Sequence, residues 1–244
     1  MTTPLFTIIT CTYNAESTLE RTIRSVDSQT YPGIEHLILD GLSSDRTLEI
    51  AARSGRARII SEPDKGLYDA MNKGISLATG DYIIFLNAGD CFHSKEALSQ
   101  VASMLEGNRP DVIYGETALV DENGEFLRMR RLQAPENLNW KSFKDGMLVC
   151  HQAFWAKTEI ARRTPYDLKY RFSADVDWCI RIMKESRVLF NTRTTLIDYL
   201  SEGMTTNNRW ASLKERFAIM RKYYGLPSTV TKHLCFMVRA VIVK

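Results

Sequence analysis

The stretch Gly80-Asp81-Tyr82-Ile83-Ile84-Phe85-Leu86-Asn87-Ala88-Gly89-Asp90 changes abruptly from apolar residues to small and polar ones. Residues 82–86 are bulky and uncharged, a pattern typical of a strand that is buried on both faces of a parallel sheet. Residues 87–90 follow at the C-terminal end of this strand, where open α/β sheets bind their ligands. The same four residues are ordinary turn formers. Taken alone, the stretch supports a ligand site and a plain turn about equally.

Length and composition limit the classes of protein that the chain can represent. It has 244 residues, 44% of them hydrophobic, enough for one large α/β domain or two small ones with a sizeable core. We find no run of 18 apolar residues and no basic-then-apolar start, so we expect no membrane span and no secretory signal. The five cysteines are widely spaced and odd in number. They predict free thiols in a reducing cytoplasm, and they argue against a disulfide framework or a zinc site.

Charge is distributed unevenly along the chain. Residues 204–244 contain eight Lys or Arg and one acid, Glu215, which is a net +7. Because the whole chain carries +3, residues 1–203 carry −4. A basic C-terminal segment favours an anionic partner such as membrane lipid, nucleic acid or a phosphorylated substrate. Nine of the ten residues 234–243 are apolar, which predicts either an anchor at the membrane interface or a helix that docks on the core of its own domain.

Strands and helices alternate through about residue 115. The pattern predicts strands at 6–12, 34–39, 57–61 and 82–86, and helices after a Ser17-x-x-Glu20 capping box, at 47–53 and at 67–78. Such alternation is typical of a mostly parallel sheet flanked by helices. Neither GxGxxG nor GxxxxGK[ST] occurs, which disfavours a dinucleotide-binding fold of the usual fingerprint and a P-loop NTPase.

The pattern changes after residue 115. We expect a hairpin of strands 117–120 and 126–130, a helix at 175–185, strands at 188–190 and 195–200, and a basic helix at 208–224. No linker separates the two halves, so the second half is expected to pack on the first and close the site. We divide the chain into a domain at 1–203, with a nucleotide-binding half at 1–115 and an acceptor and catalytic half at 116–203, and a basic helical extension at 204–244.

Three polar loops follow the predicted parallel strands, at residues 12–14, 40–45 and 87–90. The C-terminal ends of parallel strands share one edge of the sheet, so these loops outline a nucleotide-sized cleft with acids for ribose, base or metal. Asp45 is better explained as a helix cap.

Four ordered stretches resemble glycosyltransferase family 2, whose members have the nucleotide-sugar-binding GT-A fold. They are residues 8–14 (IITCTYN), 39–47 (LDGLSSDRT), 66–74 (GLYDAMNKG) and 85–90 (FLNAGD). The segments 150–153 (CHQA), 173–178 (SADVDW) and 205–208 (TTNN) resemble the branch that builds bacterial surface polysaccharides of the colanic acid type. The resemblance covers roughly residues 5–208.

The resemblance implies roles for individual residues. Asp175 would be the catalytic base, and Asp90 would hold a divalent metal, Mn²⁺ or Mg²⁺, on the donor's diphosphate. Nucleotide-sugar contacts are expected from Thr12, Tyr13, Asn14, Asp40, Asp64, Asn72, Lys73, Asn87 and Ala88. Lys73 could offset the charge of the donor phosphates, and a solvated position on a helix face is an equally good explanation for it. Acceptor contacts are expected from His151, Asp177 and Trp178. For His151 and Trp178 a structural role is the alternative, while Asp177 competes with Asp175 for the role of base. Capping of a helix start is the alternative for Asp175. The family often has Asp at positions 87 and 89, so the metal is less securely predicted than the nucleotide.

These residue types suit glycosyl transfer. The leaving nucleoside diphosphate accumulates negative charge, which a metal stabilises, and a carboxylate removes the proton of the attacking hydroxyl. Together with this chemistry, the resemblance implies an inverting hexosyltransferase that moves a sugar from a nucleotide-sugar donor, a UDP-sugar, to a lipid-linked oligosaccharide. It would be cytoplasmic and peripheral on the inner face of the bacterial membrane. The alternative is a non-catalytic nucleotide-sugar-binding protein. Nucleic acid binding is disfavoured because the tail has few interleaved aromatic residues.

Overall fold

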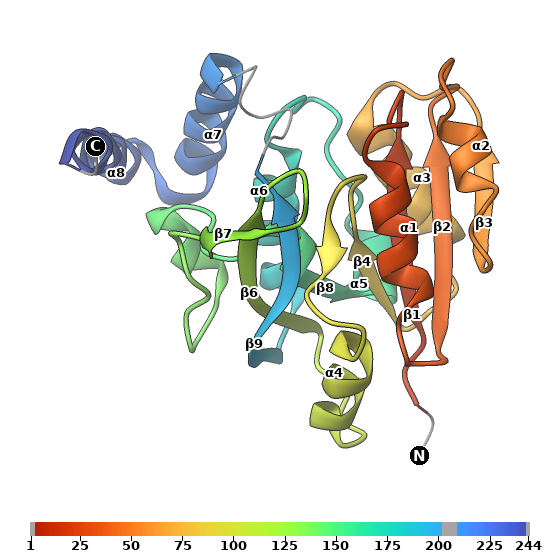
Figure 1. Ribbon diagram of the computed structural model, residues 1–244. Coiled ribbons are helices and arrows are strands. Elements are labelled where there is room, and N and C mark those ends of the chain that lie inside the picture. The colour runs from red at the N-terminus through yellow and green to blue at the C-terminus, as the bar shows by residue number, and fades with distance from the viewer. Residues whose placement is uncertain (1–2, 202–208, 243–244) are drawn as a thin grey trace.

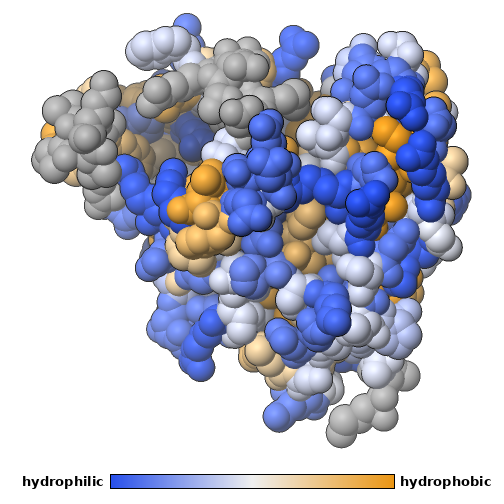
Figure 2. Space-filling view, in the orientation of Figure 1, coloured by the Kyte–Doolittle hydropathy of each residue, from blue (hydrophilic) through white to orange (hydrophobic). Residues whose placement is uncertain are grey.

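A computed structural model describes residues 3–201 and 209–242 (Figure 1). Within these residues a nine-stranded sheet has the order β3-β2-β1-β4-β8-β6-β9-β5, with β7 paired to β6. Its strands are β1 Phe6–Thr12, β2 Ile34–Asp40, β3 Ala57–Ser61, β4 Tyr82–Phe85, β5 Cys91–Phe92, β6 Val112–Val120, β7 Phe126–Met129, β8 Phe154–Lys157 and β9 Leu189–Leu200. Most of the surface in Figure 2 is hydrophilic, because most of the large apolar side chains of these strands are buried, those of β7 excepted.

Helices cover the sheet and extend beyond one end of it (Figure 1). The α-helices are α1 Leu19–Asp27, α2 Thr47–Ala51, α3 Leu67–Leu77, α4 Ala97–Leu105, α5 Thr158–Arg163, α6 Ala174–Glu185, α7 Arg209–Tyr224 and α8 Leu226–Ile242. Two short 3₁₀-helices are η1 Trp140–Asp145 and η2 His151–Ala153. Among the described helices, none is long and apolar enough to cross a membrane.

The first half of the chain forms the parallel part of the sheet. Strand β1 is buried along its whole length and pairs in parallel with β2 on one side and β4 on the other. Successive strands β2 and β3 extend the sheet one way, and β4 begins the other way. The order therefore reverses at β1, and such a switch point leaves a crevice beyond the C-terminal strand ends. The predicted α/β architecture and the strands of this half are confirmed.

Helix α3 lies directly on β1 because Gly74 has no side chain. A Cβ at Gly74 would lie 2.6 Å from the Ile9 side chain of β1, closer than carbon atoms can approach. A glycine at this point thus lets the helix backbone approach the strand. This close packing places the start of α3, and the loop before it, at the C-terminal edge of β1.

The second half differs in detail from the sequence prediction. Strand β8 pairs antiparallel with β4 and β6, while β6 and β9 run parallel. The strands expected at 188–190 and 195–200 are one strand, β9, and the strand expected at 117–120 begins at Val112. Register shifts on either side of Glu116 absorb the irregular positions, as β-bulges do. The apolar pattern of the sequence is interrupted at these positions, but the pairing of β6 with β9 continues across them.

The predicted capping box at the start of α1 is absent. The N-cap residue is Thr18, and its side chain makes no capping hydrogen bond. Glu20 forms an ion pair with Arg24 at 2.6 Å instead. The backbone carbonyl of Ala15 accepts from the N–H groups of Thr18 and Leu19, which satisfies them without a side chain.

Candidate functional site

One buried carboxylate joins the ends of three parallel strands. Asp40 is 2% exposed at the end of β2. Its Oδ1 accepts hydrogen bonds from Thr12 Oγ1 at 3.1 Å and from Ser43 Oγ, and its Oδ2 accepts from Ser43 N at 3.0 Å and Ser61 Oγ at 2.8 Å. The structure thus brings the predicted Thr12 and Asp40 together. It also shows that Asp40 holds the loops of the site in place, a role the sequence did not reveal.

Asn14 fastens the loop after β1 to the loop after β2. Its backbone has a positive φ of 48°, which asparagine tolerates better than most residues. Its Oδ1 accepts from Ser44 N at 2.9 Å, and its own N–H donates to Ser43 Oγ at 2.9 Å. Asn14 is therefore a structural link beside the expected nucleotide site.

Tyr13 and Asp64 meet at Gly41. The Tyr13 side chain is 70% exposed, so its ring is available to a ligand. A Cβ at Gly41 would lie 2.6 Å from Asp64 Oδ2 and 3.6 Å from the Tyr13 ring. A larger residue at position 41 would displace the carboxylate of Asp64. An exposed aromatic ring beside a carboxylate is a suitable surface for a nucleobase, which stacks and also donates hydrogen bonds.

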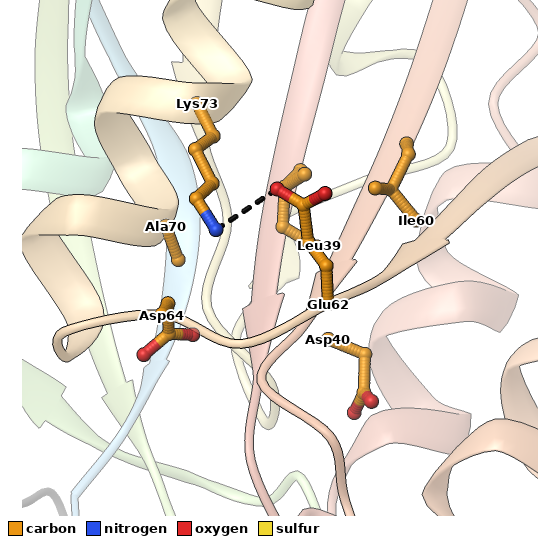
Figure 3. A pocket seen from close by; sticks show the side chains of 7 residues that line it. All are labelled: Leu39, Asp40, Ile60, Glu62, Asp64, Ala70 and Lys73. Atoms are coloured by element: carbon orange, nitrogen blue, oxygen red, sulfur yellow. Dashed lines mark ion pairs between the residues drawn. The ribbon is translucent and has the colours of Figure 1, made fainter.

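A small pocket lies between β2, β3 and α3 (Figure 3). Its lining residues are Leu39, Asp40, Ile60, Glu62, Asp64, Ala70 and Lys73. Lys73 Nζ forms an ion pair with Glu62 at 2.9 Å and donates to Pro63 O at 2.6 Å. Lys73 therefore holds the segment before α3, and its charge is already balanced by Glu62. This placement does not favour the predicted contact of Lys73 with the nucleotide-sugar.

Asn72 has a structural role that the sequence did not predict. Its Nδ2 donates to Tyr166 O at 3.0 Å, and its Oδ1 accepts from Tyr166 N at 2.7 Å. The amide nitrogen and the amide oxygen of Asn72 are thus both hydrogen-bonded to the backbone of Tyr166. Asn72 joins α3 to the segment before α6, and this geometry does not favour the predicted contact with the nucleotide.

The loop that contains Asp90 is buried. Asp90 is 3% exposed, and its oxygens accept from Gln152 Nε2 at 2.8 Å and from Leu200 N at 3.0 Å. Burial raises the pKa of Asp90 to about 7, although these hydrogen bonds oppose the shift. Ala88 packs in the apolar cluster beneath α1. Gln152 was not singled out from the sequence, yet it lies in the matched segment 150–153.

The same loop offers limited ligands to a metal. Asn87 Oδ1 is buried and has no hydrogen-bond partner, so one neutral oxygen beside Asp90 is unsatisfied. The described residues contain no group of three or more His, Cys, Asp or Glu side chains that could hold a metal ion. A cation here would fit only if the donor's phosphates supplied most of its ligands, as they often do for Mg²⁺.

Asp175 lies in the first turn of α6 and is half-buried. Its Oδ1 accepts from Val176 N at 2.9 Å and from Tyr68 Oη at 3.3 Å. Burial, and then the charge of Asp175, raise the pKa of Tyr68 well above its ordinary value. The Tyr68 hydroxyl therefore keeps its proton and donates to the carboxylate. Tyr68 lies in the matched stretch 66–74, but the sequence did not assign it a role.

Asp177 is fully buried and joins α6 to α7. Its Oδ2 accepts from Arg181 Nε at 2.6 Å, and its Oδ1 accepts from Lys222 Nζ and Tyr223 Oη, both at 2.9 Å. Burial alone would raise the pKa of Asp177, but the bonds from Lys222, Arg181 and Tyr223 outweigh it and hold the pKa below its ordinary value. With no exposed surface, Asp177 does not present the acceptor contact that we expected.

His151 and Trp178 belong to the aromatic core. His151 stacks on Phe85 with ring centroids 5.0 Å apart, and its Nε2 is hydrogen-bonded to Tyr166 Oη. Burial lowers the pKa of His151 to about 4, so the ring is neutral at pH 7. Trp178 is 0% exposed and stacks on Tyr166 at 4.9 Å. These positions correct the expected acceptor contacts, because neither ring has a face open to a sugar.

The fold and the site define an α/β protein whose polar loops meet at the C-terminal ends of β1, β2 and β3, beside the switch point of its sheet. The family model of Glycosyl transferase family 2 matches residues 7–163, and the chain belongs to that family. Its fold is the GT-A fold. It is similar to a crystal structure of S. aureus TarS 1–349 in complex with UDP-GlcNAc, with a TM-score of 0.72, 16% identity, and coverage of 89% of this chain and 64% of that one.

Two curated relatives are also similar over most of the chain. The "PGL/p-HBAD biosynthesis glycosyltransferase" of Mycobacterium bovis (strain BCG / Pasteur 1173P2) is 35% identical over 191 residues, which are 74% of this chain and 70% of that protein. The amylovoran biosynthesis glycosyltransferase AmsB of Erwinia amylovora is 28% identical over 196 residues, 73% of this chain and 64% of that protein. The colanic acid branch stays a prediction.

Proposed function

We propose that the protein is an inverting glycosyltransferase that transfers a hexose from a UDP-sugar to a hydroxyl group of a lipid-linked oligosaccharide, in the synthesis of a bacterial surface polysaccharide or glycolipid. The observation that carries this proposal is the position of Tyr68 at the start of α3. Residues 62–66, which include the pocket residues Glu62 and Asp64, lead directly into this helix. The hydroxyl of Tyr68 donates a hydrogen bond to the carboxylate of Asp175. The expected donor site and the expected base are therefore joined by one short segment.

The donor's nucleoside would bind at the edge formed by Tyr13, Gly41 and Asp64. Asp40, Thr12 and Asn14 would hold the loops around it. The choice of UDP is supported by the likeness to TarS, whose crystal structure contains UDP-GlcNAc. Involvement in polysaccharide or glycolipid synthesis is supported by the names of the two relatives.

Asp175 would act as the general base. As the acceptor hydroxyl attacks the anomeric carbon, its proton passes to the carboxylate, and the bond from that carbon to the diphosphate oxygen breaks. A single displacement of this kind inverts the anomeric configuration, and a positioned base contributes about 10²- to 10⁴-fold to the rate. Tyr68 would orient the carboxylate by its hydrogen bond.

A divalent metal, Mg²⁺ or Mn²⁺, would be held by Asp90 and Asn87 together with the diphosphate of the donor. When bound it would neutralise charge on the leaving group. Because the protein supplies so few ligands, we expect Mn²⁺ to bind only in the presence of UDP. Calorimetric titration of Mn²⁺ with and without UDP measures this, and equally tight binding without UDP would contradict it.

Helix α8 would hold the enzyme against an anionic membrane. Five of its apolar side chains are 42–58% exposed and fall within about a third of the helix circumference at 100° per residue. They are Leu226, Val230, Leu234, Met237 and Val238. The opposite face packs on the domain, where Lys232 pairs with Asp145 at 2.5 Å. Helix α7, which precedes α8 in the chain, carries exposed cations such as Lys214 and Arg221. Charge complementarity therefore favours an anionic lipid surface as the partner.

The decisive experiment is an assay with a panel of donors: UDP-glucose, UDP-galactose, UDP-GlcNAc and GDP-mannose, each with a polyprenyl-diphosphate-linked sugar as acceptor. We expect transfer from one UDP-sugar, with inversion seen by NMR of the product. The Asp175→Asn variant should lose at least about 10²-fold in kcat and bind UDP normally. Asp167→Asn, which removes a nearby half-buried carboxylate, is the matched control. UDP binding without turnover of any donor would favour the non-catalytic alternative.

A further inference from the structure

The carboxylate of Glu215 on α7 accepts hydrogen bonds from three consecutive backbone N–H groups in front of α6. Its Oε1 accepts from Arg171 N at 2.8 Å, and its Oε2 accepts from Phe172 N at 2.8 Å and from Ser173 N at 2.9 Å. Consecutive N–H groups that converge in this way form an anion-binding concavity. Here the anion is a side chain from a helix more than 40 residues further along the chain.

A second contact strengthens the same junction. Ser173 is fully buried, and its hydroxyl lies 3.0 Å from Ser212 Oγ and 3.3 Å from Ser212 O. Ser212 is one turn before Glu215 on α7, so both side chains meet the segment 171–173 from one face of that helix. Helices α6 and α7 contact each other, and their labels are neighbours in Figure 1.

This junction determines where α6 begins. Ser173 is the N-cap residue of α6, and its side chain makes no capping hydrogen bond to the helix. Its hydroxyl is directed to α7 instead, and Glu215 accepts from the N–H groups just before the helix. Asp175 follows only two residues after Ser173. A shift of segment 171–173 would therefore move the carboxylate of Asp175 relative to Tyr68.

The composition of the C-terminal segment agrees with a specific task for this acid. Glu215 is the only Asp or Glu among residues 204–244, which otherwise carry eight basic residues. Burial and then the charge of Asp175 are the main causes of the raised pKa of Tyr68, and the charge of Glu215 adds to them. Glu215 therefore lies within electrostatic reach of the Tyr68–Asp175 pair.

We propose that Glu215 is a positioning residue for catalysis: from α7 it holds the segment before α6 and so orients Asp175 toward the acceptor hydroxyl. The proposal rests on the role of Asp175 in the proposed function. It makes α7 part of the catalytic apparatus, although no atom of α7 is required to touch the substrate.

The test is the variant Glu215→Gln, which keeps the size of the side chain but removes the charge and one acceptor oxygen. We expect kcat with the active UDP-sugar to fall about 10- to 100-fold, because small displacements of a reacting group have effects of this size. The KM for the donor and the Kd for UDP should stay within about twofold of the wild type. Asp145→Asn, which breaks the ion pair between η1 and α8, is the control and should keep full activity in a detergent-solubilised assay.

A double variant separates positioning from a merely structural role. If Glu215 acts through Asp175, adding Glu215→Gln to Asp175→Asn should lower the residual rate no further, since coupled residues are not additive. An additive loss, or an unchanged kcat in the single variant, would overturn the proposal while leaving the base assignment intact. Full activity of Asp175→Asn would instead remove the base itself. If Glu215→Gln does not fold, Ser212→Ala serves in its place, and we expect it to lower kcat a few-fold at constant donor KM.

Discussion

Tyr68 and Asp175 are 107 positions apart in the chain, and the Tyr68 hydroxyl lies 3.3 Å from Asp175 Oδ1. The first residue is in the opening turn of α3 and the second is in the opening turn of α6. This contact connects the helix that follows the pocket loop to the helix that carries the proposed base.

Removing the Tyr68 hydroxyl should slow catalysis moderately. A hydrogen bond of this kind contributes about 1 kcal/mol, so we expect Tyr68→Phe to lower kcat roughly fivefold. Its Kd for UDP, measured by calorimetry, should not change. Tyr31→Phe, which removes a buried hydroxyl bonded to Pro4 O far from the site, is the matched control. Equal rates for Tyr68→Phe and the control would show that the contact does not orient the base.

Asp177→Asn should act on stability and not on chemistry. The buried carboxylate has cationic partners in Arg181 and Lys222, and breaking such a pair costs about 3 kcal/mol. We therefore expect the free energy of unfolding in urea to fall by about that amount, while the folded variant keeps its donor KM. A variant that is as stable as the wild type but inactive would make Asp177 the base and contradict our assignment of Asp175.

Asp40→Asn should weaken nucleotide binding. An amide nitrogen would replace one of the two oxygens that accept from Thr12, Ser43 and Ser61, so at least one of these donors would lose its partner. We expect the binding free energy of UDP to fall by about 1–3 kcal/mol, whichever metal is present. Glu35→Gln, at the opposite end of β2, is the control. An unchanged Kd would remove Asp40 from the nucleotide site.

The buried His151 should make stability depend on pH. Its pKa is about 4 in the folded protein against an ordinary 6.5, so below pH 6.5 the unfolded chain binds a proton that the folded one does not. The stabilising contribution is complete above pH 6.5 and is lost as the pH falls toward 4. Relative to His151→Phe, the wild type should lose about 1 kcal/mol between pH 7.5 and 5.5. If the difference in free energy of unfolding between the two proteins, measured in urea, is the same at both pH values, the ring of His151 is solvated.

The exposed face of α8 should bind anionic membranes. We expect the protein to sediment with vesicles that contain anionic lipid at low salt and to be released at high salt, because salt screens the attraction of exposed cations. Replacing Leu234 and Val238 by Ser should abolish sedimentation without changing UDP binding. The matched control replaces the exposed Leu168 and Val188 by Ser. If the Leu234/Val238 variant instead turns a dimer into a monomer, a second copy of the chain covers this face.

Substitutions test the membrane proposal better than removal of residues 230–244. The sequence left open whether this segment anchors the protein or docks on its core. In the structure one face of α8 packs against α7, where His233 contacts Phe217 with ring centroids 5.0 Å apart, and against η1, where Lys232 pairs with Asp145. The other face is exposed. Truncation would therefore uncover side chains of α7 such as Phe217 and would mix the loss of this packing with the loss of membrane binding.

The sequence by itself determined the α/β architecture and the family. A buried strand such as 82–86 can be recognised by its unbroken apolar run, and the turn residues that follow it mark where the strand ends. Because parallel strands share one edge, the polar loops at 12–14 and 40–45 were expected to meet, and the hydrogen bond of Thr12 to Asp40 confirms it. The matched motifs indicated the family because each is a short local stretch and all four occur in the order typical of the family.

Only the tertiary structure decided what each polar or aromatic residue does within those motifs. Asp175 and Asp177 are both acids in one short segment, but the first is half-buried beside Tyr68 and the second is enclosed by Arg181 and Lys222. Trp178 and His151 are core residues, and Glu215 is joined to residues 171–173. These roles depend on partners that are many residues away, and burial is a property of the packed fold. A local pattern therefore identifies the chemistry available at a position, while long-range contacts determine whether it is exposed to a substrate.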